Sequence, residues 1–434
     1  MNKYTLPADR KTHIITAGFL YFIVGEVPMP ELLAPAGGMA QLKAAIRFGA
    51  DAVYGALPAF GLRAFAGNFT WEELAQALLY VHQRGRKFYL TLNALPYEEE
   101  FPALIDTARR AADMGVDAAL VSDLGAFLAL RREAPALPLH ISTQANTLNS
   151  EAASFYARQG ARRIVLAREL SLQRICDLRQ KLPADLELEA FVHGAMCMSY
   201  SGRCMLSDHL TGRGGNRGAC AQPCRWEYAL VEKKRPGEYW PIEEDGRGTY
   251  LLSAYDLNML SHLPALIDAG IASLKIEGRM KTEYYVATVV GAYRRALDAY
   301  AAGEEAYRAL LPELEGELRK ASHRPFNTGF YFGPPAPMAG AAGFTQEMEY
   351  VAQVEAYENG LATLQLKNRF YVGDTLELLC PAGVFPFRVE GITLADTGAA
   401  VDTVSIAGQR VIIPLPHPAE AGDFLRGPNR NHRG

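Results

Sequence analysis

The segment FGADAVYGAL, residues 48–57, contains the pattern that decides the fold. Gly49 follows a helical stretch, and a short apolar run that begins at Ala52 follows the glycine. A glycine just past a helix is the usual left-handed cap, and an apolar run without alternation is typical of a parallel strand buried on both faces. We therefore predict a helix that ends near Phe48 and a buried strand over residues 52–57.

The same pattern recurs between residues 30 and 280. It predicts eight strands, at residues 32–37, 52–57, 87–94, 118–123, 139–146, 163–169, 188–194 and 273–279. Strands that alternate with helices in this number predict an α/β fold of the closed TIM-like (β/α)8 barrel type. An open doubly wound sheet is the alternative, but residues 34–38 (APAGG) lack the GxGxxG spacing of a nucleotide-binding loop.

The rest of the chain divides at changes in composition. Residues 1–28 are expected to be a leader outside the fold, and residues 29–332 form the barrel, with a helix over 283–301. Residues 333–344 are rich in Pro, Gly and Ala and are predicted to be a linker. Residues 345–434 are expected to form a small all-β barrel that binds or positions a substrate. Its strands are predicted at residues 350–354, 361–366, 375–379, 385–389 and 411–413.

The composition bounds the possible functions. The chain has 434 residues, with 44 basic against 48 acidic side chains, so no overall positive field attracts nucleic acid. An RNA substrate would need a local basic patch. Residues 14–27 could pass for a short signal peptide, but no apolar run reaches the length of a membrane span. We therefore expect a cytoplasmic protein with no membrane partner.

Four of the six cysteines lie close together in the segment 189–228, which we call the cysteine segment. They follow the seventh predicted strand with the spacing C-x6-C-x15-C-x3-C, at Cys197, Cys204, Cys220 and Cys224. Thiolates are soft ligands, and the glycines among them make the backbone pliable. Structural zinc sites usually use tight C-x2-C pairs, so the irregular gaps favour an iron–sulfur cluster over zinc. Free thiols and disulfides remain open as further alternatives.

Polar side chains gather at the carboxyl ends of the predicted strands, where a barrel of this type carries its active site. The candidate catalytic residues are Gln144, Asn146, Arg168, Glu169, His193, Lys275, Glu277 and Arg279. Arg168 and Arg279 are the candidates for binding a substrate carboxylate, because a guanidinium binds it through two hydrogen bonds.

Several polar residues at the strand ends, Asp123 among them, have a structural alternative. Asp123 and Asn146 could cap the helices that follow them, and His193 could be a core histidine with satisfied hydrogen bonds. Lys275 and Glu277 lie two apart on one strand and could form a structural ion pair.

The motifs resemble a known family. Residues 189–197 (EAFVHGAMC) and 201–207 (SGRCMLS) are similar to the signature of the collagenase-like peptidases, family thirty-two among peptidases of unknown catalytic type. The resemblance covers roughly residues 30–425. Residues 168–172, 220–228 and 367–374 are most similar to the branch of that family that hydroxylates tRNA.

This resemblance implies a function. It implies oxygen-independent hydroxylation of a tRNA wobble uridine to 5-hydroxyuridine, with prephenate as co-substrate and hydroxyl source. It implies that the four clustered cysteines hold an iron–sulfur cluster, expected to be 4Fe-4S, with zinc as the alternative in aerobic preparations. The segment after Trp226 (residues 232–245) is shorter than expected for this branch, which leaves any substrate contacts there in question.

Four other functions stay open. Sister branches of the family act on a ribosomal RNA cytidine or on a quinone precursor. The family name suggests a peptidase, for which Cys197 beside His193 would be the nucleophile, although Cys204, Cys220 and Cys224 would then have no purpose. A non-catalytic assembly factor that binds through the β-domain is the last alternative.

Overall fold

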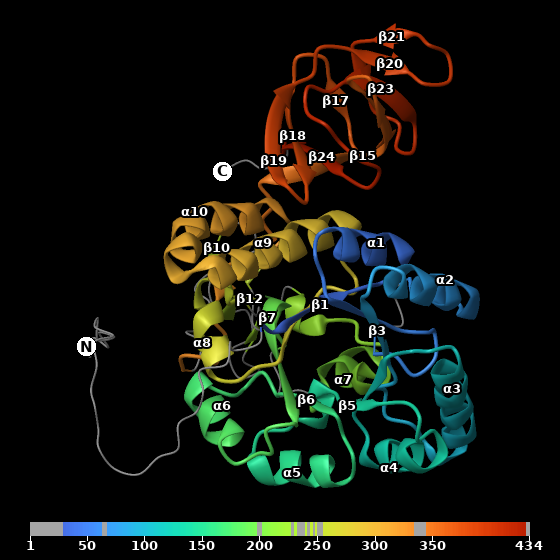
Figure 1. Ribbon diagram of the computed structural model, residues 1–434, viewed down its shortest axis with the longest axis vertical. Coiled ribbons are helices and arrows are strands. Elements are labelled where there is room, and N and C mark those ends of the chain that lie inside the picture. Colours follow the sequence, from blue (N-terminus) through green and yellow to red (C-terminus); the bar gives the residue numbers. More distant parts are fainter. Residues whose placement is uncertain are drawn as a thin grey trace.

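The computed structural model describes residues 29–62, 67–197, 202–226, 230–231, 239–240, 244–245, 248–249, 255–333 and 344–430. Figure 1 shows two parts, a helix-wrapped barrel and a C-terminal β-domain beside α1, α9 and α10. The predicted leader, nearly all of the predicted linker and most of residues 232–245 lie outside the described residues. No helix in the described ranges is long and apolar enough to cross a membrane.

The eight predicted strands all form, and they close into a parallel barrel. Their order is β1 to β7 and then β13, and β13 pairs in parallel with both β7 and β1. The TIM-like fold is therefore confirmed. The strands are β1 Glu31–Pro35, β2 Ala52–Gly55, β3 Lys87–Thr91, β4 Ala118–Val121, β5 Leu139–Ile141, β6 Arg163–Val165, β7 Glu187–Ala195 and β13 Ser273–Ile276.

Helices alternate with these strands, and short polar side chains start several of them. Thr70 closes a capping box with Glu73 at the start of α2, and Asp123 caps α4 as predicted. Asn149, not Asn146, caps α5, so the structural alternative considered for Asn146 does not hold. The helices are α1 Met39–Arg47, α2 Trp71–His82, α3 Phe101–Asp113, α4 Leu124–Glu133, α5 Ser150–Arg158, α6 Leu172–Arg179, α8 Leu263–Asp268, α9 Glu283–Ala302 and α10 Glu304–Lys320; the 3-10 turns are η1 Glu98–Glu100, η2 Thr143–Ala145 and η5 Leu260–His262.

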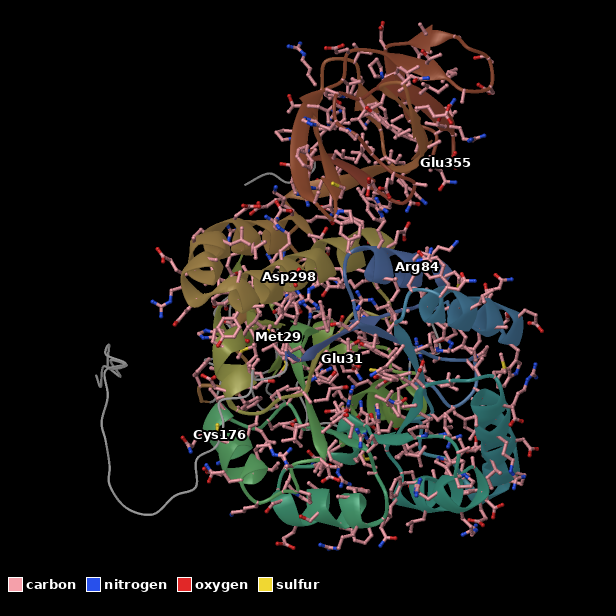
Figure 2. The ribbon with its side chains drawn as sticks, viewed as in Figure 1. Met29, Glu31, Arg84, Cys176, Asp298 and Glu355 are labelled. Atoms are coloured by element: carbon pink, nitrogen blue, oxygen red, sulfur yellow. The ribbon has the colours of Figure 1, made fainter. Side chains whose placement is uncertain are left out.

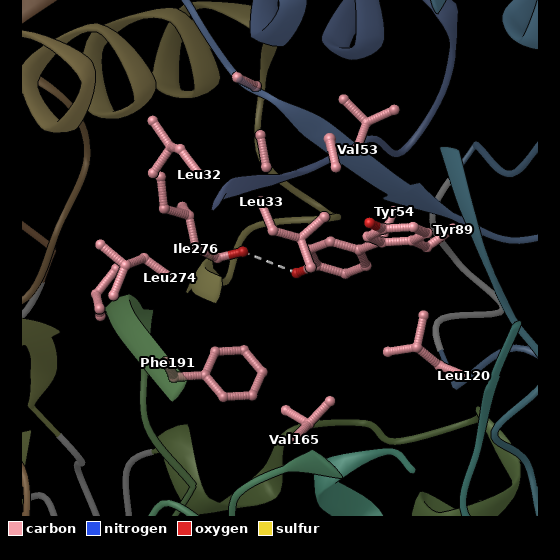
Figure 3. Close-up of a cluster of buried hydrophobic side chains, with 14 of the residues drawn as sticks. Leu32, Leu33, Val53, Tyr54, Tyr89, Leu120, Val165, Phe191, Leu274 and Ile276 are labelled. Carbon is pink, nitrogen blue, oxygen red and sulfur yellow. Dashed lines mark hydrogen bonds between the residues drawn. The ribbon is translucent and has the colours of Figure 1, made fainter. Parts of the chain in front are cut away.

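The side chains inside the barrel form layers along its axis, one of them apolar and another charged. Figure 3 shows the apolar level, where the hydroxyl of Tyr54 donates to the carbonyl of Ile276 at 2.9 Å. Arg163 is 4% exposed and pairs with Glu31 at 2.7 Å and with Glu189 at 3.0 Å. Figure 2 places Glu31 near the middle of the barrel. An ion network therefore fills space that aliphatic layers usually fill in such barrels.

The long connection between β7 and β13 carries the cysteine segment. After β7 come α7 Leu206–Thr211, η3 Gly215–Arg217 and η4 Pro223–Arg225. Further short strands follow, namely β8 Leu230–Val231, β9 Tyr239–Trp240, β10 Glu244–Asp245, β11 Gly248–Thr249 and β12 Asp256–Asn258. The antiparallel pairing of β12 with the end of β7 returns the chain to the barrel, and β14 Phe326–Asn327 pairs with β12.

The C-terminal domain is an antiparallel sheet with the order β19-β18-β24-β15-β16-β23-β20-β21. The five predicted strands are present, and five further ones, β17, β20, β21, β22 and β24, were missed. Closure of this sheet into a barrel is not among the described pairings and stays a prediction. The strands are β15 Met348–Glu358, β16 Leu361–Leu366, β17 Phe370–Tyr371, β18 Thr375–Cys380, β19 Gly383–Arg388, β20 Ile392–Leu394, β21 Ala400–Val401, β22 Thr403–Val404, β23 Arg410–Pro414 and β24 Phe424–Pro428.

Charged contacts join this domain to the barrel. Arg47 of α1 pairs with Asp423 at 2.7 Å, and Arg426, which is fully buried, pairs with Glu317 of α10 at 2.5 Å. Breaking a buried pair leaves a desolvated charge without its partner, which is strongly destabilising. These contacts therefore hold the two domains in a defined arrangement.

Candidate active site

A cavity opens at the carboxyl ends of the barrel strands. The empty space there is about 530 Å³, counted together with the open solvent at its mouth. It is lined by Tyr54, Leu62, Thr91, Asn93, Leu120, Ser142, Thr143, Gln144, Val165, Arg168, Phe191, Cys197, Lys275, Glu277 and Arg279. The lining combines three cations and one carboxylate with apolar rings, so this cavity suits an anionic organic ligand.

The cavity brings together half of the residues selected from the sequence. The members are Gln144, Arg168, Cys197, Lys275, Glu277 and Arg279. Sequence reasoning missed Tyr54, Thr91 and Phe191, which also line it. Their position at or near strand ends was the available signal, but only closure of the barrel shows that these side chains point inward.

Arg168 connects the cavity to the cysteine segment. One guanidinium nitrogen donates to the carbonyl of Ala195 at 3.2 Å and lies 4.0 Å from the sulfur of Cys197. The other pairs with Glu277 at 3.2 Å, and the group stacks 3.8 Å above the ring of Phe191. Arg168 is therefore held by a carboxylate of the chain itself, which a substrate carboxylate would have to share or displace.

Arg279 is oriented differently. Its guanidinium donates to Asn68 at 2.5 Å and to the hydroxyl of Thr91 at 3.3 Å, and the residue is 4% exposed. These two neutral acceptors orient the guanidinium in the cavity wall. Arg279 therefore stays a candidate for binding a carboxylate, beside Arg168.

Lys275 does not have the partner considered from the sequence. Its ammonium bonds Glu189 at 2.8 Å and lies 4.3 Å from the ring centre of Tyr54, while Glu277 pairs with Arg168. Burial alone would raise the pKa of Glu189, but Lys275 and Arg163 outweigh it and lower that pKa to about 2. Burial lowers the pKa of Lys275, against the opposing effect of Glu189.

His193 lies outside the cavity lining. It is 2% exposed and contacts the rings of Tyr285, Tyr293 and Phe326, and its Nδ1 lies 3.5 Å from the hydroxyl of Tyr293. Burial lowers its pKa to about 3, with smaller effects of the same sign from nearby cations. His193 is therefore a neutral core histidine at pH 7, which matches the structural alternative.

Glu169 and Asn146 are also outside the lining. Glu169 directly follows Arg168 and is half-buried. Asn146 ends η2 in a left-handed conformation, at φ 55°, and its buried side-chain oxygen has no hydrogen-bond partner among the described residues. Neither residue is therefore among the described residues that line the cavity.

The cysteine segment lies directly on the loops of the barrel mouth. A Cβ on Gly202 would be 2.1 Å from the carbonyl oxygen of Gln144, and one on Gly218 would be 2.6 Å from that of Gly61. Both glycines have positive φ, at 72° and 93°. Arg217 adds an ion pair to a glutamate of η1 at 3.0 Å. Only glycine permits these approaches.

The four clustered cysteines form no disulfide, and Cys197 is exposed. Gly215 lies beside both the carbonyl of Cys204 and the Cβ of Cys220. Four cysteines without disulfides on one glycine-rich segment form, by their chemistry, a donor set that fits an iron–sulfur cluster. Among the described residues, however, no three His, Cys, Asp or Glu side chains come close enough together to hold a metal ion. Cluster binding would therefore require the cysteine side chains to come closer together than they are in this structure.

Models of a known family match both parts of the chain. The model described as peptidase family U32 matches residues 37–339, and that of the peptidase family U32 C-terminal domain matches residues 346–426. The chain belongs to peptidase family U32. This confirms the resemblance drawn from the signature around the cysteines.

Several curated relatives of this U32 protein span nearly the whole chain. The tRNA hydroxylation protein P of Escherichia coli (strain K12) is 35% identical over 90% of this chain and 95% of its own length. The tRNA hydroxylation protein P1 of Bacillus subtilis (strain 168) is 40% identical, covering 81% of this chain and 84% of its own. A collagenase of Porphyromonas gingivalis is 32% identical, covering 91% and 97%.

Proposed function

We propose that this protein is a tRNA-modifying enzyme that converts a wobble uridine to 5-hydroxyuridine. Prephenate, not molecular oxygen, supplies the hydroxyl group, and Cys197, Cys204, Cys220 and Cys224 hold an iron–sulfur cluster. The names of the Escherichia coli and Bacillus subtilis relatives support the tRNA hydroxylation part of this proposal. Each of these relatives aligns with more than four fifths of this chain.

One observation carries the proposal. The guanidinium of Arg168 lies 4.0 Å from the sulfur of Cys197 and at the same time lines the cavity. The cysteine segment therefore meets the small-molecule site, since Cys197 and Arg168 both line the cavity. A redox centre held by this segment would lie beside the bound ligand rather than at a remote structural position.

The charges of the cavity support an acidic co-substrate. Prephenate carries two carboxylates, and Arg168, Lys275 and Arg279 outnumber the single lining carboxylate, Glu277. Charge-assisted hydrogen bonds to carboxylates are among the stronger polar contacts. Arg279 then binds one carboxylate, and Arg168 binds the other in exchange for part of its contact with Glu277.

Other residues of the cavity act on the base and on protons. When bound, the cluster supplies one-electron redox chemistry beside the cavity. Gln144 offers an amide that can both donate to and accept from a uracil edge. Lys275 holds a proton at Nζ, facing the ligand while Glu189 fixes its position. The stacked ring of Phe191 keeps the guanidinium of Arg168 away from water.

The peptidase alternative has less support. It needs His193 to activate Cys197, but His193 is enclosed by aromatic rings. No hydrogen bond joins these two residues in the part of the chain that the structure describes. A thiol without a base nearby is a weak nucleophile at neutral pH.

Nucleoside mass spectrometry tests the proposal. tRNA from cells that lack the gene should contain no 5-hydroxyuridine or its derivatives, and wild-type protein should restore them. Cys220→Ser should fail to restore them, whereas Cys176→Ser on α6 should restore them fully, because Cys176 lies outside the cysteine segment. An unchanged tRNA profile in the deletion strain would contradict the proposal and direct attention to ribosomal RNA or quinone precursors.

A further inference from the structure

A cluster of cations surrounds one turn of the C-terminal domain, residues 367–374, which we call the basic turn. Lys367 and Arg369 belong to the turn itself, and Arg388 and Arg430 reach it from β19 and from the residues after β24. The three arginines are exposed to solvent. Residues distant in sequence therefore place four positive charges around one short segment.

An aromatic ring lies among these charges. The guanidinium of Arg430 is 4.6 Å from the ring centre of Tyr371, and that of Arg369 is 6.0 Å from it. A nitrogen of Arg388 lies 3.6 Å from the position that a Cβ would take at Gly373. Cations beside an aromatic ring are the combination with which proteins bind single-stranded nucleic acid.

The charges of this cluster do not cancel. Lys367 pairs with Glu283 at 3.6 Å, and Arg430 pairs with Asp374. Among the described residues, no carboxylate forms an ion pair with Arg369 or Arg388. Two of the four cations are therefore ion-paired and two are not, in a chain whose overall formal charge is −4. This is the local basic patch that an RNA substrate requires.

The basic turn is held rigid before any ligand binds. The backbone N–H groups of Tyr371, Val372 and Gly373 donate within the domain at distances of 2.8 to 2.9 Å. Phe370 is fully buried in the core of the domain and anchors the turn. A preformed surface loses little conformational entropy on binding, which favours a role as a docking site.

The basic turn is also close to the cavity. The ammonium of Lys367 lies 3.6 Å from Glu283, the first residue of α9. Glu283 follows Arg279, a cavity-lining residue, by four positions, and four residues span at most about 14 Å. One polyanion can therefore contact the turn and reach the mouth of the cavity.

We propose that the basic turn binds the phosphate backbone of the RNA whose target nucleotide enters the cavity. The inference rests on the proposed function and adds the place where the RNA docks. Arg369 and Arg388 contact phosphates, and Tyr371 offers a ring for stacking of an unpaired base. Phosphate contacts of this kind position a nucleic acid without reading its sequence.

Binding of bulk tRNA to the full-length protein tests this docking site, by fluorescence anisotropy over a series of salt concentrations. Arg369→Ala/Arg388→Ala should raise the Kd. It should also make the negative slope of the logarithm of the association constant against the logarithm of the salt concentration less steep by about 2, one for each lost phosphate contact. The matched control is Arg132→Ala/Arg308→Ala, which removes the same charge from exposed positions on α4 and α10. That control should leave the slope unchanged.

The outcomes separate the docking site from the function. If wild-type protein and both double variants bind tRNA with the same slope, the docking site is overturned and the proposed function stands. If the wild-type protein does not bind tRNA at all, both are overturned. Substitution of the two arginines by lysine should preserve most of the slope, because the charges remain.

Discussion

The ammonium of Lys275 lies 2.8 Å from a carboxylate oxygen of Glu189, and Glu189 has no exposed surface. β7 and β13, which carry these residues, are neighbours because the barrel closes there. Lys275 faces the cavity, whereas Glu189 also contacts Arg163 within the barrel. The candidate site is therefore built on the ion network that fills the barrel, so stability and ligand binding depend on the same pair.

Glu189→Gln should destabilise the protein by about 3–5 kcal/mol, because it leaves the ammonium of Lys275 buried without its anion. The double variant Lys275→Met/Glu189→Gln should recover part of that loss, since it removes the stranded charge as well. The free energy of unfolding in urea measures both effects. A single variant as stable as the wild type would show that the pair contributes nothing.

Arg168→Gln should weaken binding of prephenate by about 10- to 100-fold, because a charge-assisted contact contributes on the order of 1.5–3 kcal/mol. Isothermal titration calorimetry on the purified protein measures this loss directly. Arg174→Gln removes a similar charge from the exposed face of α6 and should leave the affinity unchanged. Equal affinities for the two variants would exclude Arg168 from the ligand site.

The strands of the barrel could be predicted because each one is encoded in its own residues. An apolar run after a glycine-capped helix needs no distant partner to be recognised, and the start of α4 at Asp123 is equally local. The small strands β17, β20, β21 and β22 were missed because two- and three-residue strands exist only through their pairing.

The partners within the site could not be predicted in the same way. Lys275 and Glu277 are two apart, and alternation places them on one face of a strand, but a register shift follows Lys275 and each side chain meets a different partner. Glu189 is 86 positions from Lys275, so only the closed barrel reveals their contact. The burial of His193 likewise depends on α9 and β14, which come much later in the chain.

Gly202→Ala and Gly218→Ala should each loosen the cysteine segment from the barrel mouth. A Cβ there would meet the carbonyl of Gln144 or Gly61, in addition to the cost of a positive φ. Limited proteolysis should cut the segment faster in both variants, and iron content after anaerobic purification should fall.

Gly212→Ala is the matched control for these two variants. Gly212 also has a positive φ, at 66°, but no atom lies within 4 Å of the added Cβ. This variant should carry only the backbone cost of about 1–2 kcal/mol. If all three variants were cut at the same rate, close approach to the barrel would not hold the segment in place.

His193 should make the protein less stable in mild acid. Its pKa is lowered to about 3 by burial, whereas an unfolded chain has a histidine pKa near ~6.5. Between these values the unfolded state binds one more proton, so the free energy of unfolding falls as the pH falls.

His193→Gln removes this contribution, and the loss of stability between pH 6.5 and 4.5 should shrink by about 2–3 kcal/mol. Glu189 is present in both proteins, so its own titration cancels from the difference between them. Urea unfolding of both proteins at the two pH values measures the change, and an unaltered pH dependence in the variant would mean that His193 is protonated in the folded state.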